Sequence, residues 1–156
     1  MYRAISLDSA IIVTDTSKRT LWRRISEGKI ARQENDERGR AMLDFKGILP
    51  MLCVSIASED HELFINADAG DSEAQNDLAL LFLESDRPDI ALHWLRLAST
   101  QEHADAMANL GKLYIKGDGI PKNDNLGLMW LARSAAFGHV IAEQQLAALK
   151  RVGKAE

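Results

Sequence analysis

The stretch Ala106-Met107-Ala108-Asn109-Leu110-Gly111-Lys112-Leu113-Tyr114 decides most of the fold, because an earlier part of the chain repeats its pattern. The earlier copy runs from Ala74 to Phe82 and keeps the alanine, the leucine four residues later and the closing aromatic residue. The two copies lie 32 residues apart, and a third begins near Ala142. A fixed period of this length predicts pairs of helices that stack into an α-solenoid.

A tryptophan recurs in the second helix of each pair, with Trp94 matching Trp130 at an offset of 36 residues. The extra residues fall in a turn-rich loop at 117–123, whose counterpart at 85–88 is short. Small alanines suit the points where paired helices approach closely, whereas aromatic residues can fill the gaps between pairs. We therefore predict that the recurring aromatic residues belong to the core rather than to a ligand cage; they are Phe82, Trp94, Tyr114 and Trp130.

The second copy resembles the Sel-1-like repeat, a relative of the tetratricopeptide repeat. The matching residues are Ala106, Leu110, Gly111, Tyr114, Gly117, Gly119, Trp130, Ala135 and Gly138. The resemblance implies a helical repeat that binds other proteins and carries no catalysis. Because two complete copies are fewer than a solenoid normally needs, we expect partial units to seal both ends, at residues 59–69 and 141–150. The short concave face between them is expected to hold one peptide or one helix of a partner.

Residues 17–29 combine basic side chains with the signals of a helix, since Ser17 is a good N-cap and Gly28 a good stop. At 100° per residue, we expect Leu21, Trp22 and Ile25 to face the core. The opposite side then holds Arg19, Thr20, Arg23 and Arg24. This side could contact DNA phosphates and base edges, or it could be a solvated surface without a partner.

The segments around this basic helix predict a known order of elements. Residues 6–13 are predicted to form a capped helix and residues 14–16 a turn. Residues 30–33 and 41–43 are predicted strands that flank a polar tip. Helix, turn, basic helix and hairpin together make a winged helix-turn-helix.

The run of residues 17–29 also resembles the excisionase and MerR-like group of DNA-binding domains. The matching residues are Ser17, Thr20, Leu21, Trp22, Glu27, Gly28 and Lys29. The resemblance implies double-stranded DNA as a partner. On this basis, the residues predicted to contact the major groove are Arg19, Thr20, Arg23 and Arg24, and those predicted to contact phosphates are Lys18, Lys29, Arg38 and Arg40.

Charge is distributed unevenly along the chain. Residues 1–52 hold 10 Lys and Arg against 7 Asp and Glu, whereas residues 53–156 hold 9 against 16. The basic excess accompanies the predicted DNA reader, and the acidic remainder favours a protein-facing role. We therefore predict a mainly α protein with two domains: a small winged helix-turn-helix with a short β-hairpin at 1–52, followed by an α-solenoid of helix pairs at 53–156.

The sequence lacks the patterns of several other functional classes. Its four histidines are scattered and Cys53 is its only cysteine, so neither a zinc site nor a disulfide framework is predicted. We recognise no phosphate-binding loop or activated nucleophile, and we predict no enzyme activity, cofactor or metal. Because the sequence has no apolar run of about 18 residues and no secretory signal, we expect no membrane span and a cytoplasmic location.

Two hypotheses for the function remain. The first is a bacterial DNA-binding transcriptional regulator whose helical repeats bind a protein partner or mediate self-association. The alternative is a non-catalytic protein–protein adaptor in which the helix-turn-helix does not bind DNA. The alternative is motivated by the net charge of −4 and by the acidic tip of the hairpin, which contains Glu34, Asp36 and Glu37.

Overall fold

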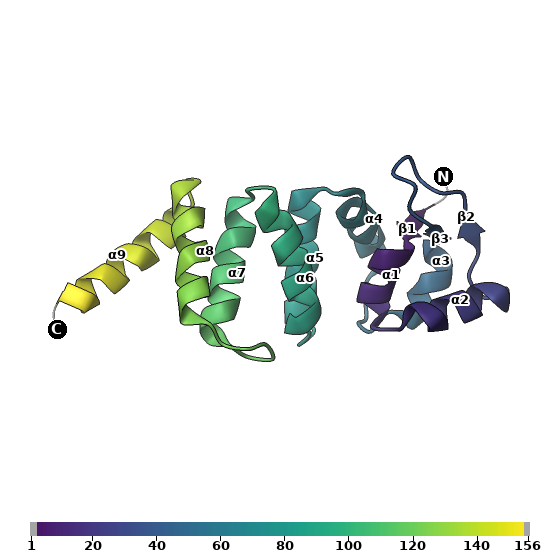
Figure 1. The fold of residues 1–156 in the computed structure, drawn as a ribbon, viewed down its shortest axis with the longest axis horizontal. Helices are drawn as coiled ribbons and strands as arrows, with labels where there is room; N and C mark the ends of the chain where they lie inside the picture. The colour runs from purple at the N-terminus through teal and green to yellow at the C-terminus, as the bar shows by residue number, and fades with distance from the viewer. Residues whose placement is uncertain (1–2, 155–156) are drawn as a thin grey trace. The chain divides into compact units, whose positions relative to one another are not determined.

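A computed structural model describes residues 3–154, and the chain divides into two compact units after Ala69 (Figure 1). Both units are mainly helical, and the first also contains a small sheet. The boundary lies later than the predicted one at residue 52, so residues 53–69 belong with the N-terminal part of the chain. The mainly α fold and the helical repeats are confirmed.

The first unit begins with short strands and short helices. Its elements are β1 (Ala4–Ser6), α1 (Leu7–Thr14), α2 (Lys18–Ser26), β2 (Arg32–Gln33), β3 (Met42–Asp44), α3 (Phe45–Ile48) and the 3₁₀ helix η1 (Leu49–Met51). The three strands are antiparallel in the order β1-β3-β2, and Leu43 in the central strand pairs with both Ile5 and Arg32. The two helices and the hairpin strands lie where the sequence predicts them, whereas β1 was not predicted.

Side-chain caps and one central leucine explain why α1 and α2 form. The hydroxyl of Ser6 accepts a hydrogen bond from the backbone N–H of Ser9, and that of Ser17 accepts one from Thr20. These bonds satisfy backbone donors that a helix start otherwise leaves free. Leu21 is fully buried, as is Leu43 of the sheet. The cap at Ser17 agrees with the sequence prediction, and it fixes the start of the basic helix.

The segment expected to open the repeats is instead part of the first unit. It forms the 3₁₀ helix η2 (Ser58–Asp60) and α4 (His61–Ala69). The Asp68 carboxylate accepts hydrogen bonds from the backbone N–H and hydroxyl of Ser6, and the Phe64 ring lies 5.6 Å from that of Phe45 between centroids. Both contacts join α4 to the N-terminal elements, which explains why the partial repeat predicted at 59–69 is not seen there.

The second unit is a stack of helices that run in alternating directions (Figure 1). Its elements are α5 (Ser72–Glu84), α6 (Pro88–Thr100), α7 (Ala104–Lys116), α8 (Asp124–Ala136) and α9 (Val140–Lys154). The pairs α5–α6 and α7–α8 are the two predicted repeats, and α9 begins a third. Phe82 and Trp94 are essentially inaccessible and Tyr114 is buried, which confirms these three aromatic residues as core. Trp130 is only half-buried, and Arg133 lies 5.2 Å from its ring centroid.

Glycine allows the second helix pair to pack closely. A Cβ atom added to Gly111 would lie 2.8 Å from the carbonyl oxygen of Gly127, and one added to Gly127 would lie 2.7 Å from that of Gly111. The backbones of α7 and α8 therefore touch at this crossing, which no larger residue permits. The sequence pattern predicted small residues where helices meet, and the structure shows how tightly this pair depends on them.

Candidate functional site

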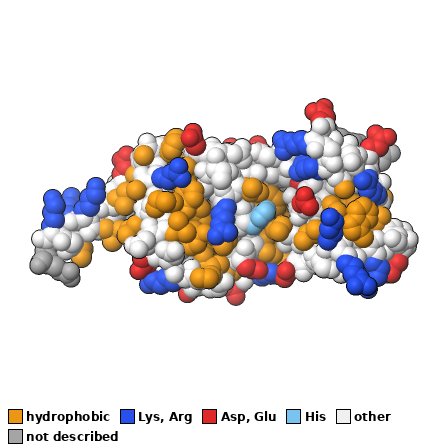
Figure 2. All heavy atoms as spheres, in the orientation of Figure 1, with side chains coloured by type: hydrophobic (Ala, Val, Ile, Leu, Met, Phe, Trp, Pro, Cys, Tyr) orange, Lys and Arg blue, Asp and Glu red, His pale blue; other side chains and the backbone are white. Residues whose placement is uncertain are grey.

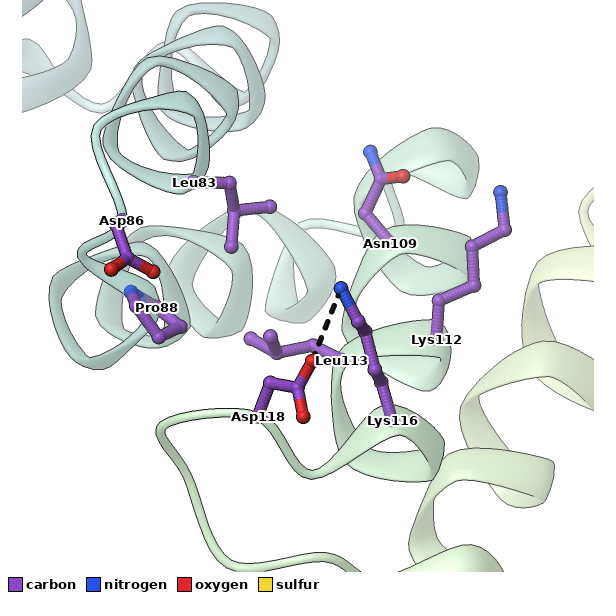
Figure 3. Close-up of a pocket in the computed structure, with 8 residues that line it drawn as sticks. All are labelled: Leu83, Asp86, Pro88, Asn109, Lys112, Leu113, Lys116 and Asp118. Atoms are coloured by element: carbon purple, nitrogen blue, oxygen red, sulfur yellow. Dashed lines mark ion pairs between the residues drawn. The ribbon is translucent and has the colours of Figure 1, made fainter.

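A pocket of about 290 Å³ opens between α5 and α7, within the second unit (Figure 3). Three apolar side chains line it, from Leu83 at the end of α5, Pro88 at the start of α6 and Leu113 in α7. Polar and charged residues form the rest of the lining; they are Asp86, Asn109, Lys112, Lys116 and Asp118. The pocket thus combines an apolar surface with charges of both signs, as binding sites commonly do.

The charges around the pocket are not all neutralised within the chain. Lys116 and Asp118 form an ion pair of 3.2 Å, drawn as the dashed line in Figure 3. Lys112 and Asp86 form no ion pair with any residue in the described range 3–154. One cation on α7 and one anion at the α5–α6 turn are therefore available to a ligand.

The amide of Asn109 is held in a defined orientation. Its Nδ2 donates a hydrogen bond of 3.0 Å to Oδ1 of Asn76, which is buried in α5. The Asn109 carbonyl oxygen then remains as an acceptor beside the pocket. Because Asn109 and Lys112 are three residues apart on one helix, their side chains lie on the same face, as Figure 3 shows.

Two turns position the remaining wall of the pocket. Asp86 has a φ of 58°, in the left-handed region that ends α5, and Pro88 then starts α6 with a fixed φ. The loop 117–123 lies against this start, because a Cβ atom added to Gly119 would lie 2.4 Å from Cγ of Pro88. The turn-rich loop that the sequence singled out therefore carries Asp118 to the pocket.

The basic helix α2 forms a second candidate surface, on the first unit. Lys18, Arg19 and Arg23 are exposed, and Lys and Arg side chains gather over this helix in Figure 2. Thr20 is half-buried, and its hydroxyl lies 2.9 Å from that of Ser17. Three of the eight predicted DNA-contacting residues are thus exposed on α2, and Arg23 lies at 4.0 Å from the Glu27 carboxylate.

The predicted faces of α2 were wrong at two positions. Trp22 is 38% exposed, whereas Arg24 is half-buried with its Nε inaccessible and unpaired among the described residues. The reason is geometric, because Leu21 points to the core. At 100° per residue, Trp22 falls outside the core-facing side of the helix, whereas Arg24 falls closer to the direction of Leu21. A helical wheel centred on Leu21 alone would have found this arrangement.

The exposed ring of Trp22 has a basic neighbour that the sequence did not indicate. The Arg32 guanidinium lies 5.9 Å from the ring centroid of Trp22, within the range of a cation–π contact. Arg32 lies on β2, so the helix and the hairpin meet here. A basic surface with a stacking aromatic ring is suited to nucleic acid, although it serves a protein partner equally well.

Lys29 is paired inside the first unit. Its Nζ lies 2.8 Å from Oε2 of Glu27, and Arg23 approaches the same carboxylate at 4.0 Å. The hydrogen bond and charge of Lys29 hold the pKa of Glu27 below its ordinary value, with a smaller contribution from Arg23. This acidic group reduces the positive potential at the C-terminal end of α2.

Arg40, one of the predicted phosphate contacts, connects the hairpin loop to α4. Its Nε lies 2.8 Å from Asp36 and its Nη1 lies 3.1 Å from the Asp68 carboxylate, which is 2% exposed. Arg38 is exposed but also donates a hydrogen bond of 3.2 Å to the backbone oxygen of Ala69. The structure therefore gives Arg40 a role inside the unit, and gives Arg38 a partner on α4.

Other kinds of site find no support among residues 3–154. No group of three His, Cys, Asp or Glu side chains in that range is arranged to hold a metal ion. His103 and His139 instead accept backbone hydrogen bonds at the starts of α7 and α9. In the same range, none of the helices has the length and apolar character that crossing a membrane requires.

Two consecutive helix pairs with a shared sequence pattern define the class of protein, an α-solenoid of short helical repeats. The family model of the Sel1 repeat matches residues 72–103 and 104–139, which are the two pairs α5–α6 and α7–α8. The crystal structure of a Sel1 repeat protein from Oxalobacter formigenes is similar at 33% sequence identity and a TM-score of 0.55, covering 62% of this chain and 76% of that one. The chain belongs to the Sel1 repeat family. A comparison with curated proteins found no match.

Proposed function

We propose that this chain is a non-catalytic adaptor that binds another protein through its Sel1 repeats. The observation that carries this proposal is the pocket between α5 and α7, where apolar side chains are accompanied by a lysine and an aspartate without ion-pair partners in the described part of the chain. Sel1 repeats are in general protein-interaction repeats, which supports the same function. A cytoplasmic location and the absence of enzyme activity are part of this proposal.

Site-specific photo-crosslinking in cells tests the adaptor function. A photoreactive amino acid at Lys112 should crosslink one discrete protein, because this position lies on the pocket wall. The matched control is Ala132, which is exposed on α8 and does not line the pocket. The same crosslinks from both positions, or none from Lys112, would contradict binding through this surface.

A second candidate function is DNA binding by the first unit. The observation that favours it is the exposed surface of Lys18, Arg19, Trp22 and Arg23, with Arg32 beside the tryptophan. The order of helices and hairpin strands in this unit is the order of a winged helix-turn-helix, with α2 in the place of the helix that enters the major groove. The chain would then be a transcriptional regulator whose repeats bind a partner or a second copy.

Salt dependence separates the two functions. If the three exposed cations of α2, Lys18, Arg19 and Arg23, each contact a phosphate, the logarithm of the DNA association constant should fall against that of salt concentration with a slope of about −3. The double substitution Arg19→Ala and Arg23→Ala should remove most of this slope without changing the urea midpoint of unfolding. Fluorescence anisotropy with a labelled duplex at roughly 50–200 mM salt measures it. If the full-length protein binds no duplex at the lowest salt, the adaptor function stands alone.

A further inference from the structure

We propose that the pocket between α5 and α7 binds an extended peptide segment with one apolar side chain, flanked by an acidic residue on the Lys112 side and a basic residue on the Asp86 side. This inference rests on the proposed adaptor function and specifies the chemistry of the bound partner. The occupant is a segment of another protein rather than a small cofactor.

The size and lining of the pocket argue for a single apolar anchor. Its volume of 290 Å³ lies at the lower limit of the roughly 300–1,000 Å³ that ligand pockets usually occupy. Leu83, Pro88 and Leu113 supply apolar contacts from three separate elements. A helical ligand would need anchors over successive turns, whereas a single anchor suits an extended chain.

The two unpaired charges would set the direction of the peptide. Lys116 is already neutralised by Asp118 at 3.2 Å, so Lys112 is the cation that remains on α7. Asp86 belongs to the turn between α5 and α6 and lies beside Pro88, across the pocket from Lys112 in Figure 3. Charges of opposite sign on opposite walls favour one orientation of a bipolar segment, because the reverse orientation places like charges together.

The Asn109 amide supplies a contact to the peptide backbone. Asn76 occupies its Nδ2 group, so the carbonyl oxygen is positioned to accept a backbone N–H from the ligand. This bond does not depend on the side chains of the peptide. Asn109 therefore contributes affinity for any extended segment, while Lys112 and Asp86 select the sequence.

Two peptides of different charge pattern test the proposal by fluorescence anisotropy with the full-length protein. The probes are the fluorescein-labelled bipolar peptide Gly-Ser-Asp-Glu-Leu-Lys-Arg-Ser-Gly and the acidic peptide Gly-Ser-Asp-Glu-Leu-Glu-Asp-Ser-Gly. We expect the bipolar peptide to bind at least about fivefold tighter than the acidic one, and replacement of its leucine by glycine to weaken binding about tenfold. Backbone amide signals of Asn109 and Leu113 should shift on titration in the NMR spectrum.

Matched variants assign the effect to the pocket. Lys112→Glu should weaken binding of the bipolar peptide at least about fivefold, whereas Lys150→Glu makes the same charge change on exposed α9 and should leave that binding intact. Asp86→Asn should weaken the preference for the bipolar peptide without strain, because asparagine tolerates the left-handed φ of 58°. Circular dichroism confirms that each variant is folded.

Failure of this chemistry can be told apart from failure of the adaptor function. Equal binding of the bipolar and the acidic peptide, equal effects of Lys112→Glu and Lys150→Glu, or no saturable binding of either peptide would each overturn the inference. If Lys112 still crosslinks a discrete protein in cells, only the ligand chemistry is wrong. If neither peptides nor crosslinks are found, the adaptor function fails as well.

Discussion

At the scale of single residues, the two repeats use different side chains for the same task. Asp71 caps the start of α5 through its carboxylate, and His103 caps α7 through Nδ1, which accepts from the N–H of Ala106 at 3.2 Å. His139 caps α9 in the same way at 3.0 Å. Two of the four histidines that the sequence shows as scattered, His103 and His139, are thus spaced by the repeat and have a structural role.

Replacing His103 by alanine should lower the free energy of unfolding by about 1 kcal/mol, the usual cost of a lost N-cap. His103→Asp should retain the stability, because Asp71 performs the same function one repeat earlier. Urea denaturation followed by circular dichroism measures both variants. If His103→Ala unfolds at the wild-type midpoint, the cap contributes nothing.

Gly111→Ala should destabilise the second unit by about 1–3 kcal/mol, because its Cβ atom would lie 2.8 Å from the Gly127 carbonyl oxygen. The control is Gly153→Ala on α9, where no atom lies within 4 Å of the added carbon. That change should be neutral or stabilising by a few tenths of a kcal/mol, since alanine favours helix. Equal thermal midpoints for the two variants would contradict the close crossing of α7 and α8.

The stability of the first unit should fall in acid through Asp36. Burial acts to raise the pKa of Asp36, but hydrogen bonds from Arg40 and Arg38 and the charge of Arg40 outweigh it and hold the pKa below its ordinary value. A lowered folded-state pKa gives stability that is present above about pH 4 and is lost as the pH falls further. Asp36→Asn should therefore flatten the stability profile between about pH 5 and pH 3. An unchanged acid profile for this variant, measured by urea denaturation at each pH, would contradict the pairing with Arg40.

At the scale of elements, the sequence predicted the features that depend on neighbouring residues and missed those that depend on long-range contacts. Caps and periodicity located α1, α2 and the helices of the repeats, because the residues that determine them are close in sequence. The strand β1 is only three residues long and pairs with β3 across about 40 residues, so no local pattern marks it. The place of α4 likewise depends on Asp68 meeting Ser6 and Arg40, which no spacing rule reveals.

For the same reason, the sequence predicted the elements that carry the candidate sites but not how their side chains are arranged. The turn-rich loop 117–123 was recognised as part of the repeat and not as part of a site, because the pocket exists only where two repeats bring Leu83 and Leu113 together. On α2, the helix itself was predicted, while Trp22 and Arg24 were assigned to the wrong sides because Leu21 alone defines the buried direction.

A fragment of residues 1–52 should be far less stable than a fragment of residues 1–69. The shorter fragment lacks Asp68 and Phe64, a fully buried ring whose burial contributes about 2–3 kcal/mol. It also leaves Arg40 without its buried partner. Circular dichroism and the dispersion of NMR amide signals distinguish the two. A cooperatively folded 1–52 fragment as stable as 1–69 would contradict the assignment of α4 to the first unit.

At the scale of the whole molecule, the boundary after Ala69 changes the electrostatic argument. Residues 1–69 hold 10 Lys and Arg against 11 Asp and Glu, because the segment added to the first unit is acidic. The basic excess that favoured a DNA-binding domain is therefore confined to the α2 surface and does not describe the unit. Sequence alone could not show this, since the net charge of a domain depends on where the domain ends.

The contact between Gly119 and Pro88 limits how freely such repeats can be exchanged. The longer loop of one repeat rests on the start of the second helix in the repeat before it, so each long-looped repeat depends on its predecessor. A rearranged array with a short-looped repeat in second place would keep its helices and lose Asp118 from the junction. The charge at the pocket therefore depends on which repeat occupies the second position, because the longer loop is what brings Asp118 there.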